Sequence, residues 1–196
     1  MPAEDIEQDF PNLKGNYKIT SPKDYRYNCF AWAGGDTHHW WQNDGAPYFF
    51  WLHNDRSHTL ESYVKAYNIV GYKEESETSE FEPDFEKVAL YVDANGLPSH
   101  AARQKDNGLW TSKLGEDEDI EHNTLKSIEG QFYGTVKIIL KKPKKYKKEK
   151  EAVENKMEDK FENFKNLAKN LVNVPKKEID VAKNLSKNKN KEKADK

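Results

Sequence analysis

The sequence predicts an α+β domain in which short helices come first, an antiparallel sheet follows, and a charged helical tail closes the chain. Three observations carry this prediction. All five Trp lie before residue 111. Between residues 87 and 140, short apolar runs alternate with turn residues, which is typical of consecutive strands. Beyond residue 140 the chain is dominated by Lys, Glu and Asn, so the folded core is expected to end there.

Composition and charge divide the 196 residues into two parts. Hydrophobic residues make up 35% and charged residues 34%, which is too polar for one core along the whole chain. Residues 141–196 carry a formal charge of +9 and contain no Arg, whereas residues 1–140 carry −11. We therefore expect a folded domain over 1–143. Over 144–196 we expect a basic linker, an amphipathic helix and a disordered end.

The first half of the chain predicts two helices among loops. Residues 29–33 open a short helix that stops at Gly34-Gly35. Residues 57–70 form the second helix, because Ser57 or Thr59 can cap it and apolar residues follow at helical spacing. The remaining segments are expected to be extended or loop, namely 1–26, 36–56 and the acidic stretch 73–86.

The second half predicts four strands and one helix. The expected strands are 87–92, 97–104, 109–114 and 133–140, with turns at 93–96 and 106–108. Residues 119–129 are expected to form a helix that points its isoleucines and leucine inward.

The register of the hairpin around Asn107-Gly108 stays open from the sequence. A two-residue turn would place Gln104 opposite Thr111, and Thr111 and Lys113 would then share the face of His100. A turn one residue longer would place Gln104 opposite Trp110, and Ser112 would join His100 instead. A slip of one residue exchanges the whole set of side chains on a face.

The one cysteine, Cys29, lies in the stretch YNCFAWA. A single cysteine cannot form an internal disulfide, so it is either a buried structural thiol or a nucleophile. The first turn of a helix would favour the thiolate through unpaired N–H groups and the helix dipole. A histidine elsewhere in the chain could stabilise that thiolate and protonate the leaving group.

Four stretches together carry a family resemblance: YNCFAWA, KVALYVDANGLPSHAARQ, GLWTSKLGEDEDIEH and EGQFYGTV. They look like an uncharacterised bacterial family that in turn resembles the papain-like superfamily, especially its NlpC-type cell-wall peptidases and amidases. The resemblance covers about residues 25–140. It implies a papain-like fold and a cysteine hydrolase or acyltransferase that acts on an amide bond, with Cys29 as nucleophile and His100 as general base and acid.

Further residues are candidates for supporting roles in this site. The Asn28 side chain and the Cys29 backbone N–H could donate to an oxyanion, although Asn28 is equally an ordinary helix cap. Ser112 and His122 are candidates for the polar partner of His100, a place that Asn, Asp or His usually takes in the superfamily. The candidate residues for lining a substrate groove are Gln104, Trp32 and Trp110.

The sequence predicts neither a metal nor a cofactor, because the histidines lack tight ligand spacing and no phosphate loop or dinucleotide motif occurs. The expected small partner is a peptide or amide substrate. Basic runs without Arg or interleaved aromatics disfavour nucleic acid. The acidic start and the absence of a long apolar run predict a cytoplasmic chain without a signal peptide or membrane span.

The tail supports a second function of a different class. Met157, Phe161 and Phe164 recur at spacings of four and three, and Ala168 and Leu171 continue the pattern. We expect a helix over residues 151–173 that contacts a protein partner or a second copy of the chain. The alternative function is therefore a non-catalytic papain-like binding module or a toxin/effector-type interaction protein that uses this helix as its contact.

Overall fold

The structure is a computed structural model that describes residues 3–43 and 49–172. The chain divides into two compact units, one over Met1–Lys144 and a second over Lys145–Lys196. All the described strands lie in the first unit.

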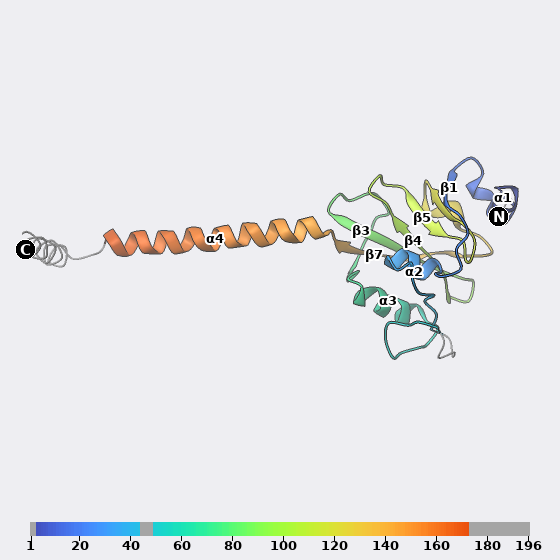
Figure 1. The fold of residues 1–196 in the computed structure, drawn as a ribbon, viewed down its shortest axis with the longest axis horizontal. Helices are drawn as coiled ribbons and strands as arrows, with labels where there is room; N and C mark the ends of the chain where they lie inside the picture. The colour runs from blue at the N-terminus through green and yellow to red at the C-terminus, as the bar shows by residue number, and fades with distance from the viewer. Residues whose placement is uncertain (1–2, 44–48, 173–196) are drawn as a thin grey trace, which may run out of the picture. The chain divides into compact units, whose positions relative to one another are not determined.

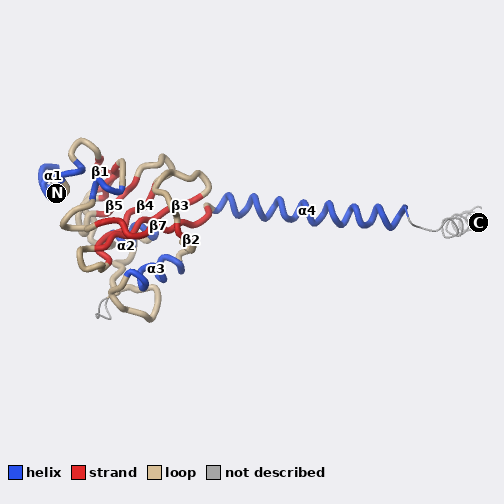
Figure 2. The backbone as a smooth tube through the Cα atoms, turned by 180° about the vertical axis from the view of Figure 1, so that it is seen from behind, coloured by secondary structure: helices blue, strands red, loops and turns tan. Residues whose placement is uncertain are grey.

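The first unit is an α+β domain built on one seven-stranded antiparallel sheet (Figure 1). The strands lie side by side in the order β1-β6-β5-β4-β3-β7-β2, so the chain from β3 to β6 runs as a meander. Figure 2 shows these strands in red from the opposite side. Their bounds are β1 Tyr17–Ser21, β2 Glu74–Glu75, β3 Phe85–Val92, β4 Pro98–Gln104, β5 Trp110–Lys113, β6 Asp119–His122 and β7 Thr135–Pro143.

The helices of this unit are short and are capped by their own sequence. In α2 (Cys29–Gly34) the Asn28 side chain accepts from the Ala31 N–H, and Gly35 ends the helix at φ 86°. In α3 (Leu60–Ile69) the Thr59 hydroxyl accepts from the Ser62 N–H. The remaining helical segments are α1 Ala3–Asp9 and the 3-10 turns η1 Pro11–Leu13 and η2 Leu125–Ile128.

The sheet separates two hydrophobic clusters, because successive side chains of a strand point to opposite faces. We name them by what covers them. On the α2 face, Val88, Leu90 and Ala101 pack with residues of α2 and α3. On the η2 face, Ala89, Tyr91 and Ala102 pack with residues of α1, η1, β5, β6 and η2.

The β4–β5 hairpin adopts the longer of the two turns. Gln104 pairs with Trp110 and Ala102 pairs with Ser112. The Lys105 N–H donates to the Leu109 carbonyl, and Gly108 has φ 84°, a conformation that glycine adopts without strain. Ser112 therefore points to the η2 face, which is the face of His100.

Three sequence expectations differ from this fold. The acidic stretch 73–86, expected to be loop, contains the short strand β2 and the start of β3. Residues 119–129 do not form one helix: 119–122 are strand β6, 125–128 are η2, and Ile120 reaches the η2 face from β6. The lead-in 1–26 contains α1, η1 and the edge strand β1, which pairs with β6. Short polar strands of this kind are stabilised by their neighbours in the sheet, and sequence periodicity does not reveal those neighbours.

The described part of the second unit is the helix α4 (Lys145–Val172). The basic residues expected to form a linker over 144–150 lie in this helix from residue 145 onward. Val153, Met157, Phe161 and Phe164 are each 58–65% exposed. The end predicted to be disordered, residues 183–196, lies outside the described residues. Within 3–43 and 49–172, no helix is long and apolar enough to cross a membrane.

Candidate functional site

Asn28 shapes the start of α2 and holds the following loop to it. Its side-chain oxygen accepts from the Ala31 N–H at 3.1 Å and from the Trp41 N–H at 3.3 Å. Its amide nitrogen donates to the Trp41 carbonyl at 2.7 Å. Because the side chain is 7% exposed and bonded on both sides, it acts as a cap and a clamp in this structure.

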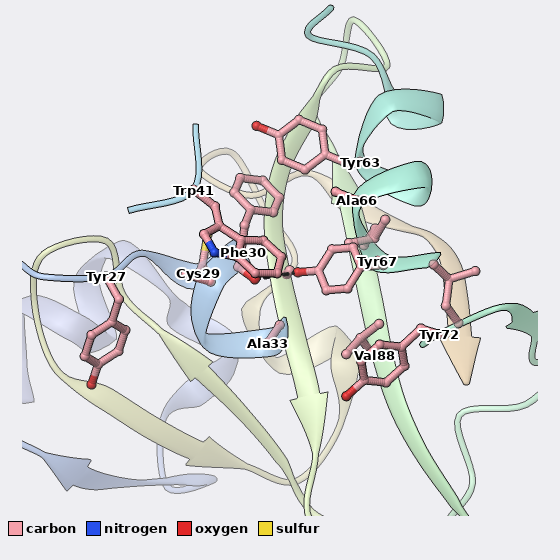
Figure 3. Packing of buried hydrophobic residues seen from close by; sticks show 14 of the residues in the cluster. Tyr27, Cys29, Phe30, Ala33, Trp41, Tyr63, Ala66, Tyr67, Tyr72 and Val88 are labelled. Atoms are coloured by element: carbon pink, nitrogen blue, oxygen red, sulfur yellow. Dashed lines mark hydrogen bonds between the residues drawn. The ribbon is translucent and has the colours of Figure 1, made fainter. Parts of the chain in front are cut away.

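Cys29 is buried in the aromatic cluster of the α2 face (Figure 3). The cluster to which it belongs contains residues of α2, α3, β3 and β4, and the Tyr67 hydroxyl donates to the Phe30 carbonyl at 2.8 Å. Burial raises the pKa of the Cys29 thiol to about 12, against smaller opposing effects of the Ala101 and Phe30 backbone. The group is therefore a neutral thiol at physiological pH, whereas nucleophilic attack requires the thiolate.

His100 lies on the other face of the sheet from Cys29. In the β3–β4 ladder, Leu90 pairs with Ala101 and Tyr91 pairs with His100. Ala101 belongs to the cluster that contains Cys29, and Tyr91 belongs to the opposite cluster. Neighbouring residues of a strand point to opposite faces, and no hydrogen bond joins the Cys29 and His100 side chains in the described residues, although the Ala101 backbone next to His100 hydrogen-bonds the Cys29 thiol.

The His100 ring sits between two tyrosines. It stacks on Tyr133 with centroids 3.9 Å apart and meets Tyr91 edge-on at 5.4 Å. Both ring nitrogens are buried, and neither has a hydrogen-bond partner in the described part of the chain. Burial lowers the pKa of His100 well below its usual value, and the charge of His122 lowers it further. The imidazole is accordingly neutral at physiological pH.

Ser112 and His122 form a hydrogen-bonded pair across β5 and β6. The His122 Nδ1 lies 2.8 Å from the Thr124 carbonyl, which can only accept, so Nδ1 carries the proton. Nε2 then accepts from the Ser112 hydroxyl at 2.9 Å. Burial lowers the pKa of His122 to about 4.

This pair has the hydrogen-bond arrangement of a catalytic serine with its general base, but neither side chain is accessible from the protein surface. Ser112 is 0% exposed and His122 is 1% exposed. A hydroxyl that no substrate can reach cannot attack one, so the pair serves the core of the η2 face in this conformation.

The residues predicted to line a groove have separate surroundings. The Gln104 amide donates to the carbonyls of Ser79 and Gly108, at 2.9 and 3.2 Å, and fastens the hairpin. Trp110 is 2% exposed in the core of the η2 face. Trp32 lies on the α2 face, half-buried.

Trp32 belongs to a ladder of rings and cations that no sequence motif indicates. The Arg103 guanidinium lies 4.4 Å from the Trp32 ring, and Tyr27 stacks on Trp32 at 5.8 Å. The Lys113 ammonium lies 5.4 Å from the Tyr27 ring. Cation–aromatic contacts contribute about 0.5–1 kcal/mol at exposed sites and about 2 kcal/mol or more when the groups are desolvated. Lys113 and Tyr27 are both buried. The ladder thereby ties α2 and its lead-in to strands β4 and β5.

A buried carboxylate anchors the same region. Asp119 accepts from the Ser21 hydroxyl at 2.7 Å and from the Tyr27 hydroxyl at 3.0 Å. Burial, followed by the hydrogen bond to Asp119, raises the pKa of Tyr27 to about 12. The sequence carries no signal for this contact, because its local pattern predicts a helix at Asp119 and strand pairing places the residue here.

The histidines of the loop before α3 have local partners. His39 lies 2.8 Å from the Asp36 carboxylate, and His58 lies 3.0 Å from the Asn43 side chain. No group of three or more metal-ligating side chains occurs within 3–43 and 49–172.

These features define an α+β protein with a seven-stranded antiparallel sheet and potentially reactive side chains divided between its two faces. Residues 18–141 match the family described as a domain of unknown function (DUF7689). The match spans more than half of the chain, so the chain belongs to this family. Comparison with curated proteins and with solved structures gives no match.

Proposed function

We propose that the protein is a non-catalytic interaction module and that its C-terminal helix α4 makes the contact. The observation that carries this proposal is the row of apolar side chains along α4. Val153, Met157, Phe161 and Phe164 are more than half exposed, and their spacing places them within one stripe of the helix.

Helix physics supports a partner for this stripe. In proteins, most helical stability comes from packing of an apolar face against another surface rather than from intrinsic propensity. Exposed phenylalanines add an unfavourable apolar surface that a second surface can cover. Contact with a partner would stabilise α4 and remove that surface from water.

The competing prediction is a papain-like cysteine hydrolase acting on a peptide or amide. It agrees with the order of a cysteine helix followed by an antiparallel sheet. It would require Cys29 and His100 to meet, and they lie on opposite faces. It would also require a thiolate from a thiol whose pKa burial raises to about 12. We therefore prefer the interaction role.

Site-specific photo-crosslinking tests this proposal on the full chain. A benzophenone side chain at position 161 points from the apolar stripe, and the same group at position 159 points from the opposite side of α4. We expect covalent protein adducts from 161 and few from 159, either with the chain itself or with other proteins of a cell extract. Equal yields from both positions, or none from 161, would overturn the interaction role of the stripe.

A further inference from the structure

We infer that the partner of α4 is a second copy of this chain, and that the two α4 helices pair antiparallel around Phe161 and Phe164. This inference rests on the proposed function and names its partner. Three features of the helix support it. The apolar residues occupy heptad positions, charged residues flank them, and the apolar and the charged residues are compatible with the same two-fold axis.

The apolar residues occupy the core positions of a short coiled coil. Taking Met157 as position d places Phe161 at a and Phe164 at the next d, and residues 168 and 171 continue the a and d sequence. The helix runs through all of these positions. A pattern that alternates steps of four and three selects a helix as its partner, because only another helix offers holes at the same spacing.

In an antiparallel pair, a residues of one helix pack beside d residues of the other. A two-fold axis between Phe161 and Phe164 places Phe161 of each chain against Phe164 of its partner. Such an interface is isologous, since the same patch serves both copies. The two bulkiest apolar residues of the stripe thereby lie at the centre of the contact.

The flanking charges obey the same two-fold axis. Glu158 and Lys165 both occupy e positions, one heptad apart and on one side of the stripe. In an antiparallel pair e residues face e residues, so Glu158 of each copy lies beside Lys165 of the other. Lys165 is 46% exposed, and its ammonium forms an exposed ion pair with Glu162 at 2.7 Å and lies 4.5 Å from the centre of the Phe161 ring. Such an exposed ion pair costs little to exchange.

The parallel arrangement is electrostatically worse. There, position g faces the following e position, which sets Lys160 of one copy beside Lys165 of the other. Symmetry repeats this repulsion, and Glu158 faces the apolar Val153 instead of a cation. The same charges therefore favour one orientation and oppose the other.

Sedimentation equilibrium of the full chain tests both the partner and the orientation. The measurement covers protein concentrations from about 1 to about 500 µM, because so short a coiled coil is expected to give a weak dimer. We compare the dissociation constants of the wild type, Glu158→Lys, Lys165→Glu and the double exchange. Asp159→Lys and Lys156→Glu make the same charge changes outside the a, d, e and g positions and serve as matched controls.

We expect a monomer–dimer equilibrium that each single exchange weakens by about five- to tenfold, because each sets two like-charge pairs across the interface. The dissociation constant of the double exchange should lie within about twofold of the wild-type value. The dissociation constants of the two control variants should lie in the same range.

Each other result overturns a defined part of the inference. A dimer that Lys165→Glu tightens would mean parallel pairing, because that change relieves the repulsion with Lys160. A dimer that neither single exchange alters would place the interface outside α4. The chain could stay monomeric to about 500 µM while position 161 crosslinks to another protein. That result would contradict pairing with a second copy, but it would agree with the proposed interaction role of α4. A monomer with no crosslink from 161 would overturn both.

Discussion

The two faces of the sheet bury different reactive side chains. The cluster on the α2 face contains the neutral thiol of Cys29 together with aromatic residues such as Trp41, Tyr63 and Tyr67. The η2 face buries polar side chains, and His100 is the most exceptional of them because no residue of the described chain bonds its ring nitrogens. The difference separates the candidate nucleophile from the candidate base. It also predicts that the two faces respond to different perturbations, the α2 face to changes of volume and the η2 face to pH.

The largest effect is expected from Trp41→Ala on the α2 face. Trp41 is 2% exposed and packs on Tyr67 at 5.9 Å, so its removal leaves a large cavity. We expect the free energy of unfolding to fall by about 3–5 kcal/mol. Urea denaturation followed by circular dichroism measures it. Trp40→Ala removes the same side chain from a half-buried site, and an equal loss there would contradict the special position of Trp41.

A smaller effect is expected from acid on the η2 face. The pKa of His122 is lowered from 6.5 to about 4, so the unfolded chain binds a proton between these values and the folded chain does not. Stability present above pH 6.5 is therefore lost as the pH falls toward 4, by up to about 1.4 kcal/mol per pH unit. Denaturation curves at about pH 7, 6 and 5 measure this slope, and the lowered pKa of His100 steepens it.

Two comparisons isolate the contribution of His122. His122→Gln should flatten the slope between pH 6.5 and 4. Asp24 and Asp55 also have lowered pKa values, about 2 in each case, because of hydrogen bonds from Arg26 and Ser57. Their contribution is lost only as the pH falls from about 4 toward 2, which is a separate window. A slope that His122→Gln leaves unaltered would refute the assignment.

Gly34→Ala tests the close packing of α2 on Trp41, with a smaller expected loss of stability. A Cβ atom at this position would lie 2.4 Å from Cη2 of Trp41, which is too close for any real contact. We expect a loss of about 1–3 kcal/mol, although alanine is the better helix former. The double variant Gly34→Ala/Trp41→Leu should lose less than the sum of the two single variants, because the shorter side chain makes room. Strict additivity would argue against the contact.

The smallest effect is expected from changing His100 while measuring Cys29. His100→Phe keeps a ring between Tyr91 and Tyr133 and removes both nitrogens. We expect the rate of iodoacetamide labelling of Cys29 near pH ~8 to be slow and to change by no more than about twofold, since the two side chains lie on opposite faces. Unfolding in urea should expose the thiol and accelerate labelling. Fast labelling of the folded protein that His100→Phe abolishes would instead support the cysteine hydrolase.

Local signals in the sequence are sufficient for several elements. Asn28 and Gly35 delimit α2, Thr59 caps α3, and the apolar runs of β3, β4, β5 and β7 are bounded by turn residues. These signals act over a few residues, through backbone hydrogen bonds and the conformational preferences of glycine. The α+β class, the helices that open the domain and the meander that follows can therefore be predicted from the amino-acid sequence alone.

The candidate site depends on contacts that no local signal encodes. Which face a strand residue occupies is a matter of register, and a shift of one residue exchanges the faces. The order of Cys29 and His100 along the chain is compatible with a catalytic pair, and only the pairing of β3 with β4 shows that they diverge. Likewise, Asp119 meets Tyr27 because β6 lies between β1 and β5. The amino-acid sequence supplies the reactive groups, whereas the folded sheet selects which of them meet, because hydrogen bonds between distant strands set the orientation of each side chain.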